Sequence, residues 1–243
     1  MLNILPIRLH RFLAARFSPE GEMGLRFTIG VALILGAAFV FGELAEDVVT
    51  GDTITLLDVR LAHWFRMHAS ARFTGAMLFV THWNSLLGSS IMAALLAGWF
   101  WYRKAYYWLI VVLMSVPGGM LLNVVLKHLF QRARPTLEDP LLTLSTYSFP
   151  SGHTEAATVF YGLLACYLVR CVPRWPARAA IMAGACAMVM LVALSRMYLG
   201  VHYLSDVLAA SAEGAAWLAL CITAVSTLQR RRAARARGRE VAA

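Results

Sequence analysis

Six apolar windows of roughly 20 residues run through this chain and restrict what it can fold into. A helix of about 20 apolar residues crosses the ~30 Å hydrocarbon core of a bilayer. The composition agrees, because 60% of the 243 residues are hydrophobic and the mean hydropathy is +0.65. The windows lie near residues 26–46, 74–101, 106–126, 155–172, 178–195 and 206–227. We therefore expect an all-α polytopic membrane protein with six transmembrane helices.

The distribution of positive charge predicts the orientation of these helices. Lys and Arg residues near span ends are retained in the cytoplasm. With both termini in the cytoplasm, fifteen of the 22 Lys and Arg residues lie on the inner side and seven on the outer side. Three of the outer seven, Lys127, Arg134 and Arg196, belong to polar motifs described below. The expected topology places those motifs on the outer face of the membrane.

One membrane domain with two basic tails is expected. Residues 1–25 form a cytoplasmic N-tail, residues 26–228 the six-helix domain and residues 229–243 a cytoplasmic C-tail. The first window is interpreted as a retained span and not as a cleaved signal peptide, because no small-residue cleavage site follows it. The net charge of +9 and the arginine-rich C-tail suit anionic lipid headgroups, which attract each basic residue by about 1 kcal/mol near the surface. The bilayer is therefore an expected partner, and nucleic acid is not.

Two longer segments are predicted on the outer side. Residues 47–72 mix apolar and charged side chains in a way that suits a helix lying in the membrane interface. Residues 128–153 contain three prolines and little helical periodicity, so a loop is expected.

Lys127 and Arg134 mark the start of that loop, with six residues between them and Pro135 next. A basic residue at a span end often serves as an anchor whose charge reaches the interface, and Arg132 is interpreted in that way. Lys127 and Arg134 are assigned instead to a phosphate site, because the retention rule gives no reason for cations on the outer face.

Pro150-Ser151-Gly152-His153 comes immediately before the fourth window. The free backbone N–H groups at a helix start favour anions, and glycine lets a ligand approach the backbone closely. Alone, Ser151 would be interpreted as an ordinary helix cap. The adjacent His153, on the same side of the membrane as three cations, favours a phosphate site.

Ser195-Arg196 is followed by His202 and, four residues later, by Asp206. On a helix, residues four apart share a face. A carboxylate bonded to one ring nitrogen fixes the histidine tautomer and leaves the other nitrogen nucleophilic. A purely structural His–Asp pair is the alternative.

Taken together, the three motifs resemble the type-2 phosphatidic acid phosphatase superfamily, the lipid phosphate phosphatases. That pattern is a lysine, six residues and Arg-Pro, then Pro-Ser-Gly-His, then Ser-Arg, five residues, His, three residues and Asp. Every position is filled, in order, between residues 127 and 206.

The resemblance implies a role for each motif residue. His202 forms a phosphohistidine, Asp206 orients it, and His153 protonates the leaving oxygen and then activates water. The phosphoryl oxygens are expected to be held by Lys127, Arg134, Ser151, Gly152 and Arg196. The resemblance implies no metal or other cofactor, and oligomeric state is left open.

The shared motifs do not select a lipid substrate. Undecaprenyl pyrophosphate is favoured because an outward site suits recycling of a lipid carrier, with phosphatidylglycerol phosphate, phosphatidic acid and lipid A as alternatives. A lipid phosphotransferase would use the same residues, and a lipid-binding or transport relative is the non-enzyme alternative. The implied location is a bacterial inner membrane, with the site facing the periplasm.

Further polar residues lie within the windows. Asn123 and Glu213 are expected to face the bundle interior, because a polar side chain facing lipid is costly. His82, Trp83 and Asn84 are placed near the outer end of the second window, where contact with a headgroup is the hypothesis.

Overall fold

The computed structural model describes residues 24–136, 142 and 144–241. Within these ranges the chain forms eight α-helices and no strand, which confirms the all-α expectation. The helices are α2 (Leu25–Thr50), α3 (Thr53–Met67), α4 (Ala71–Trp83), α5 (Leu86–Tyr102), α6 (Tyr106–Phe130), α7 (Gly152–Cys171), α8 (Trp175–Tyr198) and α9 (Leu204–Val241).

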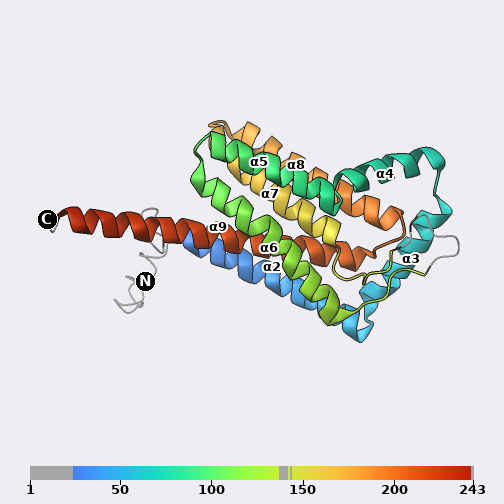
Figure 1. The fold of residues 1–243 in the computed structure, drawn as a ribbon. Helices are drawn as coiled ribbons and strands as arrows, with labels where there is room; N and C mark the ends of the chain where they lie inside the picture. The colour runs from blue at the N-terminus through green and yellow to red at the C-terminus, as the bar shows by residue number, and fades with distance from the viewer. Residues whose placement is uncertain (1–23, 137–141, 143, 242–243) are drawn as a thin grey trace, which may run out of the picture.

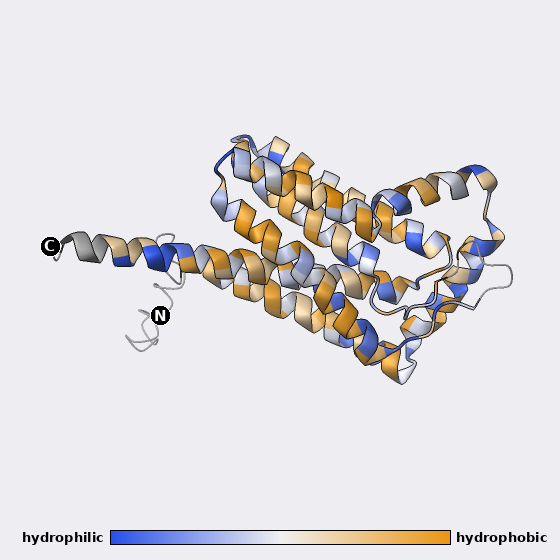
Figure 2. Cartoon of the chain, viewed as in Figure 1, coloured by the Kyte–Doolittle hydropathy of each residue, from blue (hydrophilic) through white to orange (hydrophobic). Residues whose placement is uncertain are grey.

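The long helices lie side by side along the axis of one bundle (Figure 1). α2 begins at the end of the bundle from which α9 projects, and the two helices lie side by side. The opposite end carries α3, the start of α7 and the loop that joins α6 to α7. Figure 2 shows apolar residues along the long helices and hydrophilic residues at this loop end and on the projecting part of α9.

The number of membrane spans differs from the expected six. By length and composition, the part of the chain that the structure describes holds four candidate spans, in α2, α6, α8 and α9, and a fifth if α4 and α5 count as one bent span. The window near 155–172 forms α7, which is not among these candidates. Six spans are therefore not confirmed.

The second window, residues 74–101, was expected as one helix, and this expectation is wrong. α4 and α5 meet at an angle of 51°. The break has a local cause: Asn84 Nδ2 donates to Val80 O at 2.9 Å and ends α4, and Ser85 Oγ accepts from Gly88 N at 3.2 Å and begins α5. Two capping side chains in succession favour a new helix over continuation of the old one.

α7 lies inside the bundle, which explains why it is less apolar than the candidate spans. It packs against α6, α8 and α9, and Val159 and Leu163 on it are fully buried in the main core cluster. At the crossing with α9, a Cβ added to Gly214 would lie 3.0 Å from Thr158 Cβ and 3.1 Å from Glu155 O. The small residue thus permits the close approach of helices expected in a membrane bundle.

The two segments that were expected on the outer side contain a helix and a loop. α3 lies within residues 47–72 and packs against both α8 and α9. The predicted loop is shorter than expected, because α6 extends to Phe130 and Gln131 ends it in the left-handed conformation, with φ at 47°. The loop therefore begins at Gln131 and carries Arg132 and Arg134, whereas Lys127 lies on α6.

Candidate active site

The structure brings the three motif stretches together at one end of the bundle. Lys127 lies in the last turn of α6, Arg134 in the following loop, and Ser151 at the start of α7. Arg196 lies in the last turn of α8, and Asp206 in the first turn of α9. A direct contact joins the second and third stretches, since Ser151 N donates to Asp206 O at 3.1 Å.

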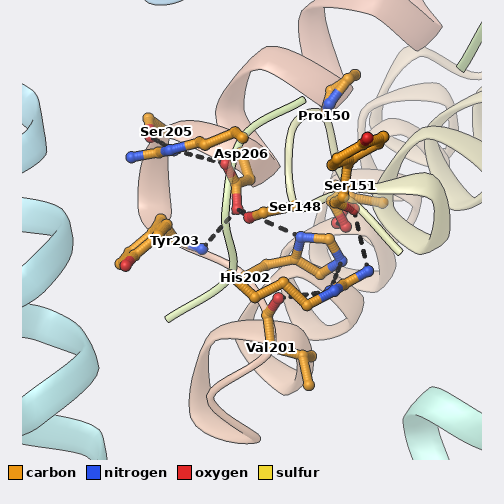
Figure 3. A network of polar contacts seen from close by, with 12 residues as sticks. Ser148, Pro150, Ser151, Val201, His202, Tyr203, Ser205 and Asp206 are labelled. Atoms are coloured by element: carbon orange, nitrogen blue, oxygen red, sulfur yellow. Dashed lines mark hydrogen bonds and ion pairs between the residues drawn. The ribbon is translucent and has the colours of Figure 1, made fainter. Parts of the chain in front are cut away.

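His202 and Asp206 form the buried centre of this end. His202 Nδ1 lies 3.3 Å from Asp206 Oδ2, and Tyr203 N donates to the same oxygen at 2.9 Å. Ser148 Oγ donates to it as well. In Figure 3 the imidazole and the carboxylate point toward one another, with Ser148 and Tyr203 beside the carboxylate. This arrangement favours the tautomer with the proton on Nδ1 and leaves Nε2 with a free electron pair.

The expectation that His202 and Asp206 share one helix face is wrong. α8 ends at Tyr198 and α9 begins at Leu204, so His202 lies in the connection between them. Gly200 has a φ of 72° and forms the turn there, a conformation that glycine adopts without a steric penalty. The contact joins a residue that precedes α9 to a residue in its first turn.

Burial favours the neutral form of His202. It lowers the pKa of His202 to about 3, although the hydrogen bond and the charge of Asp206 act in the opposite direction. At neutral pH the imidazole is therefore unprotonated at Nε2, as a nucleophile requires.

Loop carbonyl groups hold Arg134 over the histidine. Arg134 Nε donates to Thr146 O and Nη1 donates to Val201 O, both at 2.6 Å. Its Nη1 lies 3.3 Å from His202 Nε2. Lys127 Nζ donates at 2.9 Å to Tyr147 O, in the same loop. Arg134 is thereby fixed beside His202 Nε2, and Lys127 is held by the same loop.

Arg196 is buried almost completely, with 1% of its surface exposed. Its Nη1 donates to Thr81 Oγ1 on α4. Its Nε and Nη2 have no hydrogen-bond partner among the described residues. Unpaired guanidinium N–H groups are costly to bury, so this end of the bundle is suited to an anion that accepts from them.

The start of α7 contributes Ser151, Gly152 and His153. A Cβ added to Gly152 would lie 3.0 Å from Asn123 Oδ1, so the glycine packs closely against the Asn123 side chain. The Ser151 side chain does not cap the helix, and its Oγ accepts from Thr154 Oγ1 at 3.1 Å. His153 interacts electrostatically with Arg196, His202, Lys127 and Arg134, which puts its imidazole among the charges of the site.

Arg132 and Asp58 were not assigned to the site from the sequence. Arg132 was interpreted as a membrane anchor, but its guanidinium bridges two buried carboxylates, Asp58 at 2.8 Å and Asp206 at 2.6 Å. Burial opposes its charge, yet Asp206 and Asp58 outweigh burial and raise the pKa of Arg132 above its ordinary value. A usable signal was Asp58 among the apolar residues of the amphipathic segment 47–72, although nothing local links it to Arg132.

The polar residues expected inside the bundle are there. Asn123 Nδ2 donates to Glu213 Oε2 at 3.0 Å, and both side chains are buried. Glu155 was missed: it is 1% exposed, and neither carboxyl oxygen has a partner among the residues described. Asn84 is buried and accepts from Tyr161 Oη at 3.1 Å, so it serves helix packing. The headgroup hypothesis for His82 stays a prediction.

Comparisons with known proteins identify the family of this chain. Residues 105–230, more than half of the chain, match the PAP2 superfamily. Phosphatidylglycerophosphatase B of Bacillus subtilis (strain 168) is 42% identical over 115 residues, which cover 46% of this chain and 55% of that protein. The match thus spans about half the length of that curated relative.

Two solved structures share the fold. The crystal structure of the first transmembrane PAP2-type phosphatidylglycerolphosphate phosphatase from Bacillus subtilis has a TM-score of 0.62 and 28% identity, covering 79% of this chain and 93% of that one. The crystal structure of Aquifex aeolicus LpxE has a TM-score of 0.55 and 21% identity, covering 68% and 94%, and supports the fold alone. Since the family match extends over more than half of the chain and includes all three motif stretches, the chain belongs to the PAP2 superfamily.

Proposed function

We propose that this protein is an integral membrane lipid phosphatase that hydrolyses a lipid phosphomonoester or pyrophosphate through a phosphohistidine on His202. The observation that carries the proposal is the pairing of a neutral, Asp206-bound imidazole with Arg134, whose Nη1 lies 3.3 Å from His202 Nε2. A nucleophile beside fixed cations suits attack on a phosphorus atom whose oxygens carry negative charge.

The reaction proceeds in two displacements. His202 Nε2 attacks phosphorus and the bond to the leaving oxygen breaks, while His153 donates a proton to that oxygen. Burial and the neighbouring cations lower the pKa of His153 to about 2, so this proton has to come with the negatively charged phosphate, which favours the protonated imidazole. His153 then takes a proton from water, and the hydroxyl oxygen attacks the phosphohistidine. The phosphorus–nitrogen bond breaks, inorganic phosphate leaves, and both imidazoles return to their starting forms. Asp206 holds the Nδ1 proton of His202 throughout.

The phosphoryl oxygens are held by side chains and backbone groups that are already in position. Arg196 offers the two buried nitrogens that lack partners, and Arg134 and Lys127 are fixed by loop carbonyls. The backbone at Ser151 and Gly152 adds the positive end of α7. Preorganised donors of this kind are worth about 10²–10³ each in rate.

The similar proteins guide the choice of substrate. Two of them carry phosphatidylglycerol phosphate in their names, which favours this lipid as the first substrate to test. Undecaprenyl pyrophosphate, favoured from the sequence, is the second, and phosphatidic acid the third. All three present a phosphate group on an apolar anchor to the same set of cations.

An outward orientation of the site completes the proposal. The site lies at the end of the bundle opposite the start of α2 and the arginine-rich end of α9 (Figures 1 and 2). Because arginine-rich ends are retained in the cytoplasm, the site faces the periplasm of a bacterial inner membrane.

Phosphate release by the detergent-purified protein tests the function. We expect release from at least one of phosphatidylglycerol phosphate, undecaprenyl pyrophosphate and phosphatidic acid, with EDTA present, and its loss in His202→Ala. Phosphoryl transfer to an added acceptor lipid with no release to water would favour a phosphotransferase. Binding of a substrate without turnover, in folded protein, would instead favour a lipid-binding relative.

A further inference from the structure

A buried chain of polar contacts joins the outer helix α3 to the imidazole. It runs from Asp58 on α3 through Arg132 in the loop to Asp206 and His202. We propose that Asp58 and Arg132 are positioning residues that hold Asp206, and through it set the orientation and basicity of His202. This inference rests on the proposed function of His202 as nucleophile.

Arg132 is held between the two carboxylates with little freedom. Its Nη2 donates to Asp58 Oδ2 at 2.8 Å, and its Nη1 donates to Asp206 Oδ1 at 2.6 Å. The guanidinium carbon lies 4.4 Å from the centroid of the Tyr203 ring, so its flat face is also packed. Its side chain is 14% exposed, whereas both carboxylates are fully buried. A planar fork that donates in two directions fits this position, and a lysine does not.

Asp206 uses its two oxygens for different tasks. Oδ2 faces His202 and accepts from Tyr203 N, while Oδ1 accepts from Arg132. Arg132 therefore fixes the rotation of the carboxylate about its side chain, and that rotation decides whether Oδ2 faces the imidazole. Arg132 does not contact His202, so any effect on the nucleophile passes through Asp206.

Asp58 adds a second attachment, to the first turn of α9. Its Oδ1 accepts from Ser205 N at 2.9 Å, and Ser205 directly precedes Asp206. A carboxylate accepting from a free N–H at a helix start is a stabilising cap. Here the cap comes from another helix, so the docking of α3 fixes the backbone that carries Asp206.

The charge of Arg132 also affects His202. Without this cation, the buried Asp206 carboxylate is less neutralised and draws a proton more strongly onto the imidazole. The groups that face His202 from the surrounding elements are Asp206 on α9, Arg134 in the loop, Arg196 on α8, Lys127 on α6 and His153 on α7. Asp206 favours the protonated imidazole, and the positively charged groups oppose it. Arg132 opposes it indirectly, by neutralising Asp206, so its loss shifts the balance toward a protonated, inactive His202.

Arg132→Gln and Asp58→Asn test the inference in the phosphate-release assay. We expect kcat to fall by about 10- to 100-fold, by analogy with the loss of a partner that orients a metal-binding histidine, with KM changed by less than about threefold. The acid limb of the kcat profile should move to higher pH in Arg132→Gln. Arg132→Lys keeps the charge and should restore the wild-type pH profile without restoring the full rate.

Asp52→Asn is the matched control. Asp52 caps the start of α3 through Thr53 N and is exposed, so this variant makes the same chemical change on the same helix away from the site. It should keep the wild-type kcat and pH profile. If Arg132→Gln and Asp58→Asn behave like Asp52→Asn, the inference is wrong while the proposed function stands.

A different result separates the two proposals. If the folded wild-type protein releases no phosphate from any substrate, the proposed function is wrong. Amide hydrogen exchange then decides the structural part: exchange at the start of α9 must be faster in Asp58→Asn and Arg132→Gln than in Asp52→Asn. Equal protection in all three variants would overturn it.

Discussion

At the scale of single residues, the candidate site contains cations whose N–H groups are held in position to bind a phosphate. Arg196 shows this most clearly, because one guanidinium nitrogen is tied to Thr81 while Nε and Nη2 have no partner in the described part of the chain. A lysine has one ammonium group in place of the fork and cannot bond Thr81 and a phosphate in the same geometry. The residue type at this position therefore matters beyond its charge.

Arg196→Lys should lower kcat/KM by about 10²- to 10³-fold, the usual effect of losing one preorganised donor. Arg72→Lys on the exposed surface of α4 is the control and should leave kcat/KM unchanged. Steady-state phosphate release at several substrate concentrations measures both. An Arg196→Lys enzyme with wild-type kcat/KM would remove Arg196 from the phosphate site.

Sequence reasoning at this scale finds residues whose chemistry is concentrated in short motifs. The eight motif residues meet at one end of the bundle, as expected from the three stretches. Arg132 and Asp58 could not be found in the same way, because their ion pair joins positions 74 residues apart. A lone arginine at a span end has the same local pattern whether it anchors the helix or pairs with a buried carboxylate.

At the scale of helices, close crossings in the bundle depend on residues without a side chain. Gly214 on α9 lies against the backbone of α7, since a Cβ added to Gly214 would lie 3.1 Å from Glu155 O. α7 begins with the Ser151-Gly152-His153 stretch, so a shift of this crossing would also move the candidate phosphate site. Packing and chemistry are therefore linked through one helix.

Gly214→Leu should destabilise the bundle by about 1–3 kcal/mol, since a large side chain at a tight crossing forces the helices apart. Gly36→Leu on α2 is the matched control, because a Cβ there meets no atom of the described chain within 4 Å. Thermal unfolding in one detergent compares the two variants. Equal Tm values would show that the α7–α9 crossing tolerates a larger side chain.

The elements themselves follow from the sequence only in part. Long apolar windows predict helices because the bilayer leaves the backbone few alternatives. The division of residues 74–101 into α4 and α5 was missed, since Asn84 and Ser85 lie within a continuous apolar window and their capping bonds to Val80 and Gly88 appear only in the structure. The lower hydropathy of α7 is explained by its place inside the bundle, which no single window reveals.

At the scale of the whole molecule, the arrangement puts the candidate site and the arginine-rich part of α9 at opposite ends (Figure 1). This separation can be tested by chemical labelling in intact cells. Ser145 is exposed in the loop next to Arg134, and Cys171 is exposed at the far end of α7.

Ser145→Cys should react with a membrane-impermeant maleimide added outside intact cells, because its loop is expected on the outer face. Cys171 should react only after the membrane is permeabilised. Mass spectrometry of the labelled peptides distinguishes the two positions, with the other cysteines replaced by serine. The reverse pattern would invert the proposed topology.

The length of α9 has a practical consequence for imaging a small membrane protein. Its 38 residues, at about 1.5 Å per residue, give a rod of roughly 57 Å, longer than a bilayer of ~40–45 Å with its headgroups. One unbroken helix therefore carries Asp206 in its first turn and leaves the bundle at its other end. A rigid helical scaffold joined in phase after Ala236 would extend this rod, giving cryo-electron microscopy a particle large enough to align without touching the site.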